Sequence, residues 1–344
     1  METNASNTGD AIRRSRDRVW EHRLVWILLF AILGLWCYFF LIGRVDSKLT
    51  VEMVKQLRKE FPGHLVFIDR AQFQAGKSIT IEGLRISKPT DQGLRDVLRC
   101  GRIVCLGPIE MIGLVQGQLP VQKALVDDVE LCVWPLSDGR FSVQELSSSK
   151  PLTASCPSID VRSGLIRLGG ETGKVDQEII LHDLRAHAEL APRMLEDRIM
   201  PLSANISVTV SSSYFNKATF RTTVSQDKSS WRAEGKVTKL AYSQRLAGQL
   251  PSKLQQYLVQ AAGFSGELDA NFVARLDQGK LTYEARSTIT DGRLMHPQVP
   301  YPLESLSGEV FCRNGLMQLR NVRATSGQAT VAFACDVQDR KSVV

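Results

Sequence analysis

The histidines and paired carboxylates are the residues that could do chemistry, and their spacing does not assemble a reaction centre. His182 and His187 lie five positions apart in a segment that alternates with period two, so we expect them on opposite faces of a strand, unable to share a metal. Asp127-Asp128 predicts a turn between strands. The remaining histidines, His22, His64 and His296, match no ligand pattern. These observations predict a protein that is not an enzyme and holds no metal or cofactor.

Glycines and cysteines give no second route to a chemical site. The glycines between Gly164 and Gly173 form no GxGxxG motif and do not open a helix, so a nucleotide cradle is unsupported. Seven cysteines are present, one of them, Cys37, inside an apolar run, and no CxxC pair occurs. Buried free thiols are the simplest interpretation of the other six, although an oxidising compartment would permit bridges.

The charge of the chain is dispersed. A net charge of +7 and a pI near 9.1 favour anionic partners, but no run of Lys and Arg is long enough for a nucleic-acid patch. We therefore expect no nucleic acid and a weak preference for anionic lipid head groups. Hydrophobic content of 43% and charged content of 23% are typical of a folded chain.

A run of twenty uncharged residues, Leu24–Gly43, is the strongest single feature. As a helix rising about 1.5 Å per residue it spans the ~30 Å core of a bilayer. It is longer than a signal-peptide core of about 7 to 15 residues, and no small-x-small cleavage site follows it. The sequence predicts an uncleaved signal anchor with residues 1–23 as a cytoplasmic tail, although the flanking Arg and Lys counts are tied.

The next segment, residues 44–63, predicts an amphipathic helix that Pro62-Gly63 ends. Leu49, Met53, Leu57 and Phe61 recur at helical spacing. Such a helix either lies on the membrane surface or caps the sheet that follows.

From His64 onward the apolar period changes to two, which predicts antiparallel strands with one wet face. Gly83 shifts the alternation by one step, as a bulge does. The turns Asp138-Gly139, Gln278-Gly279, Asp291-Gly292 and Asn314-Gly315 predict hairpins. The expected strands lie at residues 78–87, 129–133, 141–145, 164–169, 178–190, 203–211, 218–225, 231–238, 266–276, 281–290, 303–313, 316–323 and 328–337.

Few helices are expected among these strands. They lie at residues 108–116 and 241–262, the second divided by Pro251. We divide the chain into a β region (64–150), a middle β region (151–240) beginning in the linker 147–157, a helix with a β-meander (241–337) and a tail (338–344). At ~4.8 Å per strand, roughly 15 strands form a ribbon about 70 Å long. That ribbon either curls into an apolar gutter or closes as a sandwich.

Three stretches resemble AsmA-like proteins. The first comprises ITIEGLRI at 79–86, residues 102–133 and SDGRFSVQEL at 137–146. The second is residues 249–276, similar to the helix-then-strand join of the AsmA/TamB-type repeat. The third is residues 303–337, similar to the family's last repeat unit. Together they cover most of residues 77–337, although this chain has fewer strands than the larger members.

The resemblance implies a mainly β (α+β) protein: an N-terminal transmembrane helix, then a long curled antiparallel sheet with an open groove and a few short covering helices. It also implies an inner-membrane protein facing the periplasm, a phospholipid or other acyl lipid as partner, and a role in phospholipid transport or envelope biogenesis. The expected groove-lining residues are Ile79, Ile81, Val129, Leu131, Val133, Ile206, Val208, Phe272, Leu276, Val331 and Phe333. The alternative is an envelope assembly scaffold that binds protein partners through sheet edges and carries no lipid.

Overall fold

The computed structural model describes residues 46–338 except 75–77, 92, 109–120, 137, 139, 147–155, 170–177, 196–197, 228, 251–262, 278, 296–300 and 315. The predicted membrane span, the helix at 108–116 and most of the linker at 147–157 lie outside these residues. No helix in the described part of the chain is long and apolar enough to cross a membrane.

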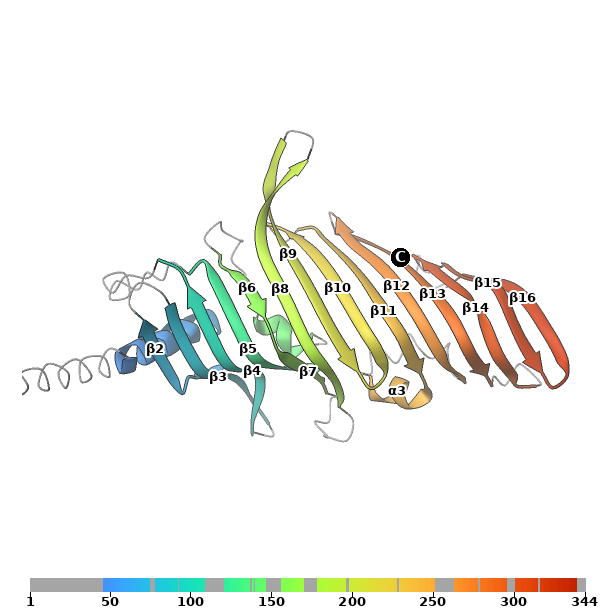
Figure 1. Ribbon diagram of the computed structural model, residues 1–344, viewed down its shortest axis with the longest axis horizontal. Coiled ribbons are helices and arrows are strands. Elements are labelled where there is room, and N and C mark those ends of the chain that lie inside the picture. Colours follow the sequence, from blue (N-terminus) through green and yellow to red (C-terminus); the bar gives the residue numbers. More distant parts are fainter. Residues whose placement is uncertain are drawn as a thin grey trace, which may run out of the picture.

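The described strands form one sixteen-stranded sheet, shown edge to edge in Figure 1. Fourteen strands follow one path, while β2 pairs with β3, and β7 pairs with β5 and β8. The path therefore measures about 60 Å at ~4.8 Å per strand. The strands are β1 (Leu65–Phe67), β2 (Arg70–Gln74), β3 (Ser78–Thr90), β4 (Gly93–Leu106), β5 (Lys123–Val133), β6 (Ser158–Val161), β7 (Gly164–Leu168), β8 (Ile179–Leu195), β9 (Arg198–Ser212), β10 (Phe215–Ser225), β11 (Trp231–Tyr242), β12 (Phe264–Asp277), β13 (Lys280–Leu294), β14 (Leu303–Arg313), β15 (Leu316–Ser326) and β16 (Ala329–Gln338).

The prediction of a mainly β, antiparallel architecture is confirmed, with one exception in strand direction. β5 pairs in parallel with β6 and β7, which together fill one position in the sheet between β5 and β8. A parallel neighbour cannot be reached by a tight hairpin, so the chain crosses over between β5 and β6. Part of that crossover is the short 3-10 helix η1 (Ser142–Leu146).

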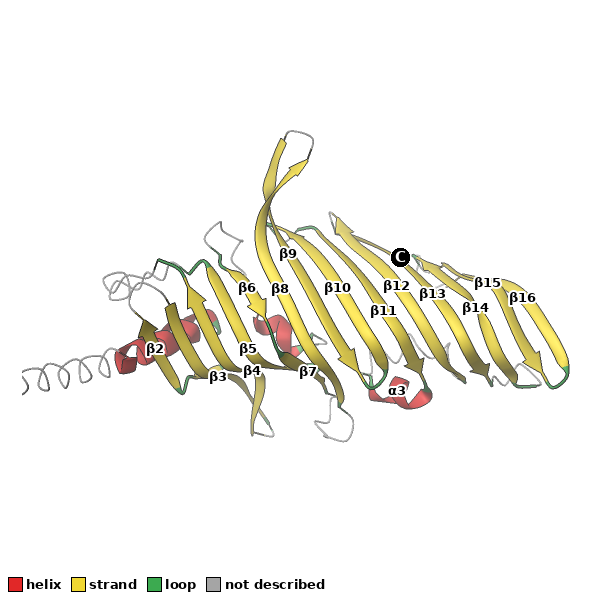
Figure 2. Ribbon diagram, viewed as in Figure 1, coloured by secondary structure: helices red, strands yellow, loops and turns green. Residues whose placement is uncertain are grey.

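Helices are few among the described residues, and two of them lie near the N-terminal strands. The first helix (residues 46–60) lies across the earliest strands, η1 lies near β5 and β7, and α3 (Gln244–Gln249) lies at the lower edge beside β11 (Figure 2). Ser243 caps α3, since its hydroxyl accepts the N–H of Leu246 at 3.3 Å. The described residues contain no second sheet, so the closed-sandwich alternative is not what forms.

Three local predictions are wrong. The expected strand at 141–145 is η1, because the Ser142 hydroxyl accepts the N–H of Trp134 and donates to the carbonyl of Cys132, which turns the chain back. Asp127-Asp128 is not a turn but the interior of β5. Asp291-Gly292 is likewise inside β13.

The last two errors share a cause. Asp128 and Asp291 both adopt a left-handed backbone, with φ of 53° and 51°, inside a continuous strand. Asp tolerates this conformation better than most residues, and a bulge uses it as readily as a turn does. Gln278-Gly279 and Asn314-Gly315 do lie between strands, with φ of 80° at Gly279 and 47° at Asn314.

Candidate functional site: one apolar face of the sheet

The strand register places apolar side chains on one face across the whole sheet, and we call this the apolar face. Cross-strand partners share a face in a sheet. One row across it runs Val208, Phe220, Gly235, Phe272, Ala285 and Cys312, from β9 to β14. Another links Leu319 to Cys335 and Val322 to Phe333.

All the residues expected to line a groove lie on the apolar face. The pairings Ile81–Ile103–Val126 and Leu98–Leu131–Ile166 connect the N-terminal members. The pairings Ala188–Ile206 and Leu276–Leu281 connect the later ones. The full set is Ile79, Ile81, Val129, Leu131, Val133, Ile206, Val208, Phe272, Leu276, Val331 and Phe333.

The members of this set differ in exposure. Ile79, Ile81 and Val129 are 1%, 5% and 6% exposed and belong to a core cluster. The other eight are partly exposed. Further along the same face, Leu281 and Tyr283 are 55% and 39% exposed. The apolar face is therefore closed at its N-terminal end and open to solvent over β12 and β13.

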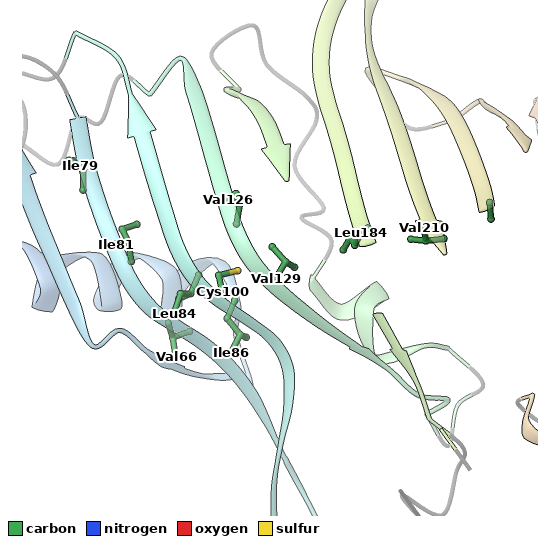
Figure 3. Packing of buried hydrophobic residues seen from close by; sticks show 11 residues of the cluster. Val66, Ile79, Ile81, Leu84, Ile86, Cys100, Val126, Val129, Leu184 and Val210 are labelled. Atoms are coloured by element: carbon green, nitrogen blue, oxygen red, sulfur yellow. The ribbon is translucent and has the colours of Figure 1, made fainter. Parts of the chain in front are cut away.

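The first helix closes the N-terminal end. Its predicted stripe, Leu49, Met53, Leu57 and Phe61, packs against the cluster that contains Ile79 and Ile81. Figure 3 shows Ile79, Ile81, Leu84 and Cys100 beside this helix. The expectation that the helix caps the sheet is therefore confirmed.

The same helix also blocks an edge of the sheet. The Thr50 hydroxyl accepts the backbone N–H of Ala71 at 3.0 Å, and the Asp46 carboxylate accepts that of Phe73 at 3.3 Å. Both N–H groups belong to β2, which pairs only with β3 among the described strands. An unpaired edge invites strand addition, so this contact protects it.

A row of left-handed residues crosses the sheet, and sequence patterning found only its first member, Gly83. Its residues lie within seven different strands. Most precede an apolar-face residue directly: Leu84, Val129 and Leu184 are 6%, 6% and 5% exposed, and Leu306 and Val322 are 4% and 2% exposed. The sequence signal for such a left-handed residue is a polar residue followed by an aliphatic one, at a point where the apolar alternation shifts by one position. The row comprises Gly83, Asp128, Asp183, Lys239, Asp291, Ser305 and Asn321.

Gly235 lies beneath two aromatic rings of the apolar face. A Cβ added there would lie 2.4 Å from Phe272 Cε1 and 3.0 Å from Phe220 Cδ1. The ring centroids of Phe220 and Phe272 are 5.9 Å apart. A glycine inside a strand ordinarily weakens it, whereas Gly235 makes room for a ring from each neighbouring strand.

The opposite face, which we call the polar face, carries charge ladders at the parallel junction. Glu130 accepts from Arg167 and lies 3.7 Å from Arg99, and Arg167 lies 3.6 Å from Glu178. A second ladder joins Lys123, Asp160 and His187. Parallel pairing is slightly weaker than antiparallel pairing, and these side chains connect the short strands β6 and β7 to their neighbours.

The ladders shift protonation equilibria. The hydrogen bond that His187 donates to the Asp160 carboxylate raises the pKa of His187 above its ordinary value, and hydrogen bonds from Lys123 and then His187 lower the pKa of Asp160. Hydrogen bonding to Glu130 raises the pKa of Arg167. These are ion pairs between structural side chains.

The prediction that His182 and His187 lie on opposite faces is wrong. His182 pairs with Ser211 and His187 with Ser207, both on the polar face, because the left-handed residue Asp183 between them shifts the alternation. Four strand positions separate Ser207 from Ser211, about 13 Å, so the two imidazoles still cannot share a metal.

The reactive residue types are engaged or buried in the described part of the chain. Cys100, Cys105 and Cys132 form no disulfide. Burial raises the pKa of Cys100 to about 11 and is the main cause of the same shift in Cys132. No cluster of His, Cys, Asp and Glu among the described residues could hold a metal ion. The dominant surface is thus an apolar sheet face that can solvate apolar groups.

Comparison with models of protein families and with curated proteins finds no match to this chain.

Proposed function

We propose that this protein is a lipid conduit, anchored in the inner membrane through Leu24–Gly43 with its sheet in the periplasm. It would hold phospholipid acyl chains on the apolar face during transport or envelope biogenesis. The carrying observation is the continuity of that face across fourteen strand positions without a second sheet among the described residues. Large contiguous apolar patches on a folded protein mark binding surfaces.

The row of left-handed residues supports a gutter shape. A bulge puts an extra residue on the polar side of its strand: in β8 Asp183 adds one position against β9, and its carboxylate accepts from the Ser211 hydroxyl on that side. Lengthening one side of a strand bends it away from that side. Because the bulges follow one line across the sheet, we infer that the sheet is concave toward the apolar face.

The energetics suit a carrier without a specific polar site. Each buried methylene contributes about 0.8 kcal/mol, so two acyl chains bind through solvation alone while the head group stays in water. The apolar rows run across successive strands, along the sheet. A lipid can therefore move along the sheet while its chains keep equivalent contacts. Such work needs no catalytic residue.

The test is the amount of phospholipid that co-purifies with the full-length protein. Val208→Asp with Phe272→Asp introduces two charges on the apolar face and should reduce bound phospholipid at least several-fold. Thr209→Asp with Asn271→Asp adds the same charges one residue away, on the polar face, and should leave it unchanged. Equal retention in both variants, with the fold intact, would refute the conduit.

A scaffold without lipid is the second candidate, favoured by the end of the sheet. β16 is last in strand order and has β15 as its only partner among the described strands. An edge of this kind can accept a strand from a partner protein. The scaffold predicts that the apolar-face aspartates leave partner binding and function intact.

A further inference from the structure

The outward side of the first helix (residues 46–60) is unlike an ordinary solvated helix face. Leu49, Met53 and Leu57 point to the core, so residues about half a turn away point outward. There Val51 is 67% exposed. Together with Val54 it lines a shallow depression of about 480 Å³.

Basic side chains surround this apolar strip. The depression is bounded by Lys55, Arg58 and Lys59, all exposed. Lys48 is exposed on the same side. The one acidic neighbour, Glu52, pairs with Lys55 at 3.7 Å. Four basic residues thus accompany one acidic residue, and one terminal nitrogen of Arg58 also donates to the Val66 carbonyl at 3.5 Å.

An apolar strip flanked by Lys and Arg is the pattern of a helix that lies in a membrane interface. The aliphatic residues enter the acyl boundary, and the long basic side chains extend their charges to anionic head groups. The sequence supplies the location: only two residues, Arg44 and Val45, separate the uncharged run Leu24–Gly43 from residue 46. If that run spans the bilayer, this helix begins at the membrane surface.

We propose that the face formed by Lys48, Val51, Val54, Lys55, Arg58 and Lys59 binds the surface of an anionic bilayer, while the inner side of the same helix caps the apolar face of the sheet. The inference rests on the membrane anchor of the proposed function. It adds a contact that sets the orientation of the sheet: the closed end of the apolar face is held against the lipid head groups.

The experiment uses the full-length protein in vesicles containing 30% phosphatidylglycerol and in vesicles of phosphatidylcholine alone. A ketone-bearing residue placed at position 51 is spin-labelled without using the native cysteines. Accessibility to membrane-soluble oxygen is compared with accessibility to a water-soluble nickel complex. A label at Tyr301, which is 70% exposed in the loop before β14, is the control.

We expect the position-51 label to be oxygen-accessible and nickel-protected in anionic vesicles, and the position-301 label to be nickel-accessible. Replacing Lys55, Arg58 and Lys59 by Glu should increase nickel accessibility at position 51 several-fold, since each basic residue near an anionic surface favours binding by roughly fivefold. The charge-matched control Lys217→Glu, Lys236→Glu, Arg275→Glu alters exposed residues of the sheet and should change nothing.

Two results would overturn the inference. In the first, the protein floats with the vesicles while position 51 stays nickel-accessible. In the second, position 51 is protected from both reagents, which means that protein, not lipid, covers this face. Failure of the protein to float at all would instead refute the anchor on which the proposed function depends.

Discussion

The two halves of the sheet treat the same apolar face differently. From β1 to β5 the face is covered by the first helix and η1, and its residues form a core: Ile79 and Ile86 are each 1% exposed. From β8 to β16 the described residues provide only short cover, and equivalent positions such as Phe272 and Leu276 stay partly exposed. One alternating pattern thus forms a core under the first helix and a second, smaller core around Ile289, Leu306 and Val322, and it stays partly open to solvent elsewhere, as at Phe272 and Leu281.

The difference in exposure between the two halves indicates which apolar-face residues stabilise the fold and which are available for binding. Buried aliphatic residues contribute through packing, whereas exposed ones contribute little to folding. Partly exposed apolar positions such as Phe272 and Leu276, and the exposed Leu281, contribute less to the fold and need another explanation. A lipid on the open half is the explanation proposed above. Substitutions in the covered half should therefore reduce mainly stability, and substitutions in the open half should reduce mainly lipid binding.

The largest contrast is expected for a charge on the apolar face. Ile86→Asp buries a carboxylate at a position that is 1% exposed and should cost more than about 4 kcal/mol in the free energy of unfolding. Leu281→Asp, at 55% exposure, should cost less than about 1 kcal/mol. Chemical denaturation of both variants measures this, and equal losses would mean that the open half is also a core.

The next largest loss of stability is expected where Gly235 contacts the rings of Phe220 and Phe272. Gly235→Val places branched carbons against two rings and should destabilise the protein by about 1 to 3 kcal/mol. Adding Phe272→Ala should recover part of that loss, because the double variant removes the clash. Additive losses in a double-mutant cycle would show that the rings do not cover the glycine.

A smaller effect is expected in the row of left-handed residues, and its sign depends on the residue that is introduced. Asn321→Val forces a β-branched residue to φ of 52° and should cost about 1 to 2 kcal/mol. Asn321→Gly should be neutral or slightly stabilising, as glycine adopts this conformation freely. The same pair of changes at Asp128, in β5 of the covered half, where φ is also 53°, tests whether the left-handed positions of the two halves behave alike. Matching losses for Val and Gly would contradict a left-handed requirement.

The smallest effect is the pH dependence of the junction between the halves. The pKa of His187 is raised, so its contribution to stability is complete below its unfolded pKa of about 6.5 and is lost as pH rises through the raised value. The Tm difference between the wild type and His187→Gln should therefore be larger at pH 5.5 than at pH 9. It should be small at both, because His187 is 44% exposed. A larger Tm difference at pH 9 than at pH 5.5 would contradict a raised pKa of His187.

Much of the fold could be predicted from alternation and turns. Period-two stretches located most strands, and Gly279 and Asn314 marked true hairpins. Asp128 and Asp291 were wrongly predicted to lie in turns, because Asp adopts the left-handed conformation in turns and inside irregular strands alike, and only the neighbouring strands decide between the two. The parallel junction could not be predicted either, since it depends on which strands meet, and short strands such as β6 carry little information about that.

The candidate site could be predicted in part, because it too depends on the alternation of apolar and polar residues. Alternation identifies the apolar side of each strand, so all the expected lining residues share one face. Alternation says nothing about what covers that face. Ile79 and Phe272 occupy similar alternating positions in the sequence, yet within the described part of the chain a helix lies over the first only. The consequence of the slip at Asp183 for His182 and His187 was missed because a bulge shifts the faces of every residue after it.

Photo-crosslinking at adjacent residues tests the central claim most directly. A benzophenone side chain at Leu281 faces the apolar side, and one at Thr282, the next residue, faces the polar side of the same strand. In cells, the account predicts phospholipid adducts at position 281, identified by mass spectrometry, and few or none at position 282. Equal lipid labelling at both positions, or labelling by protein alone at position 281, would contradict it.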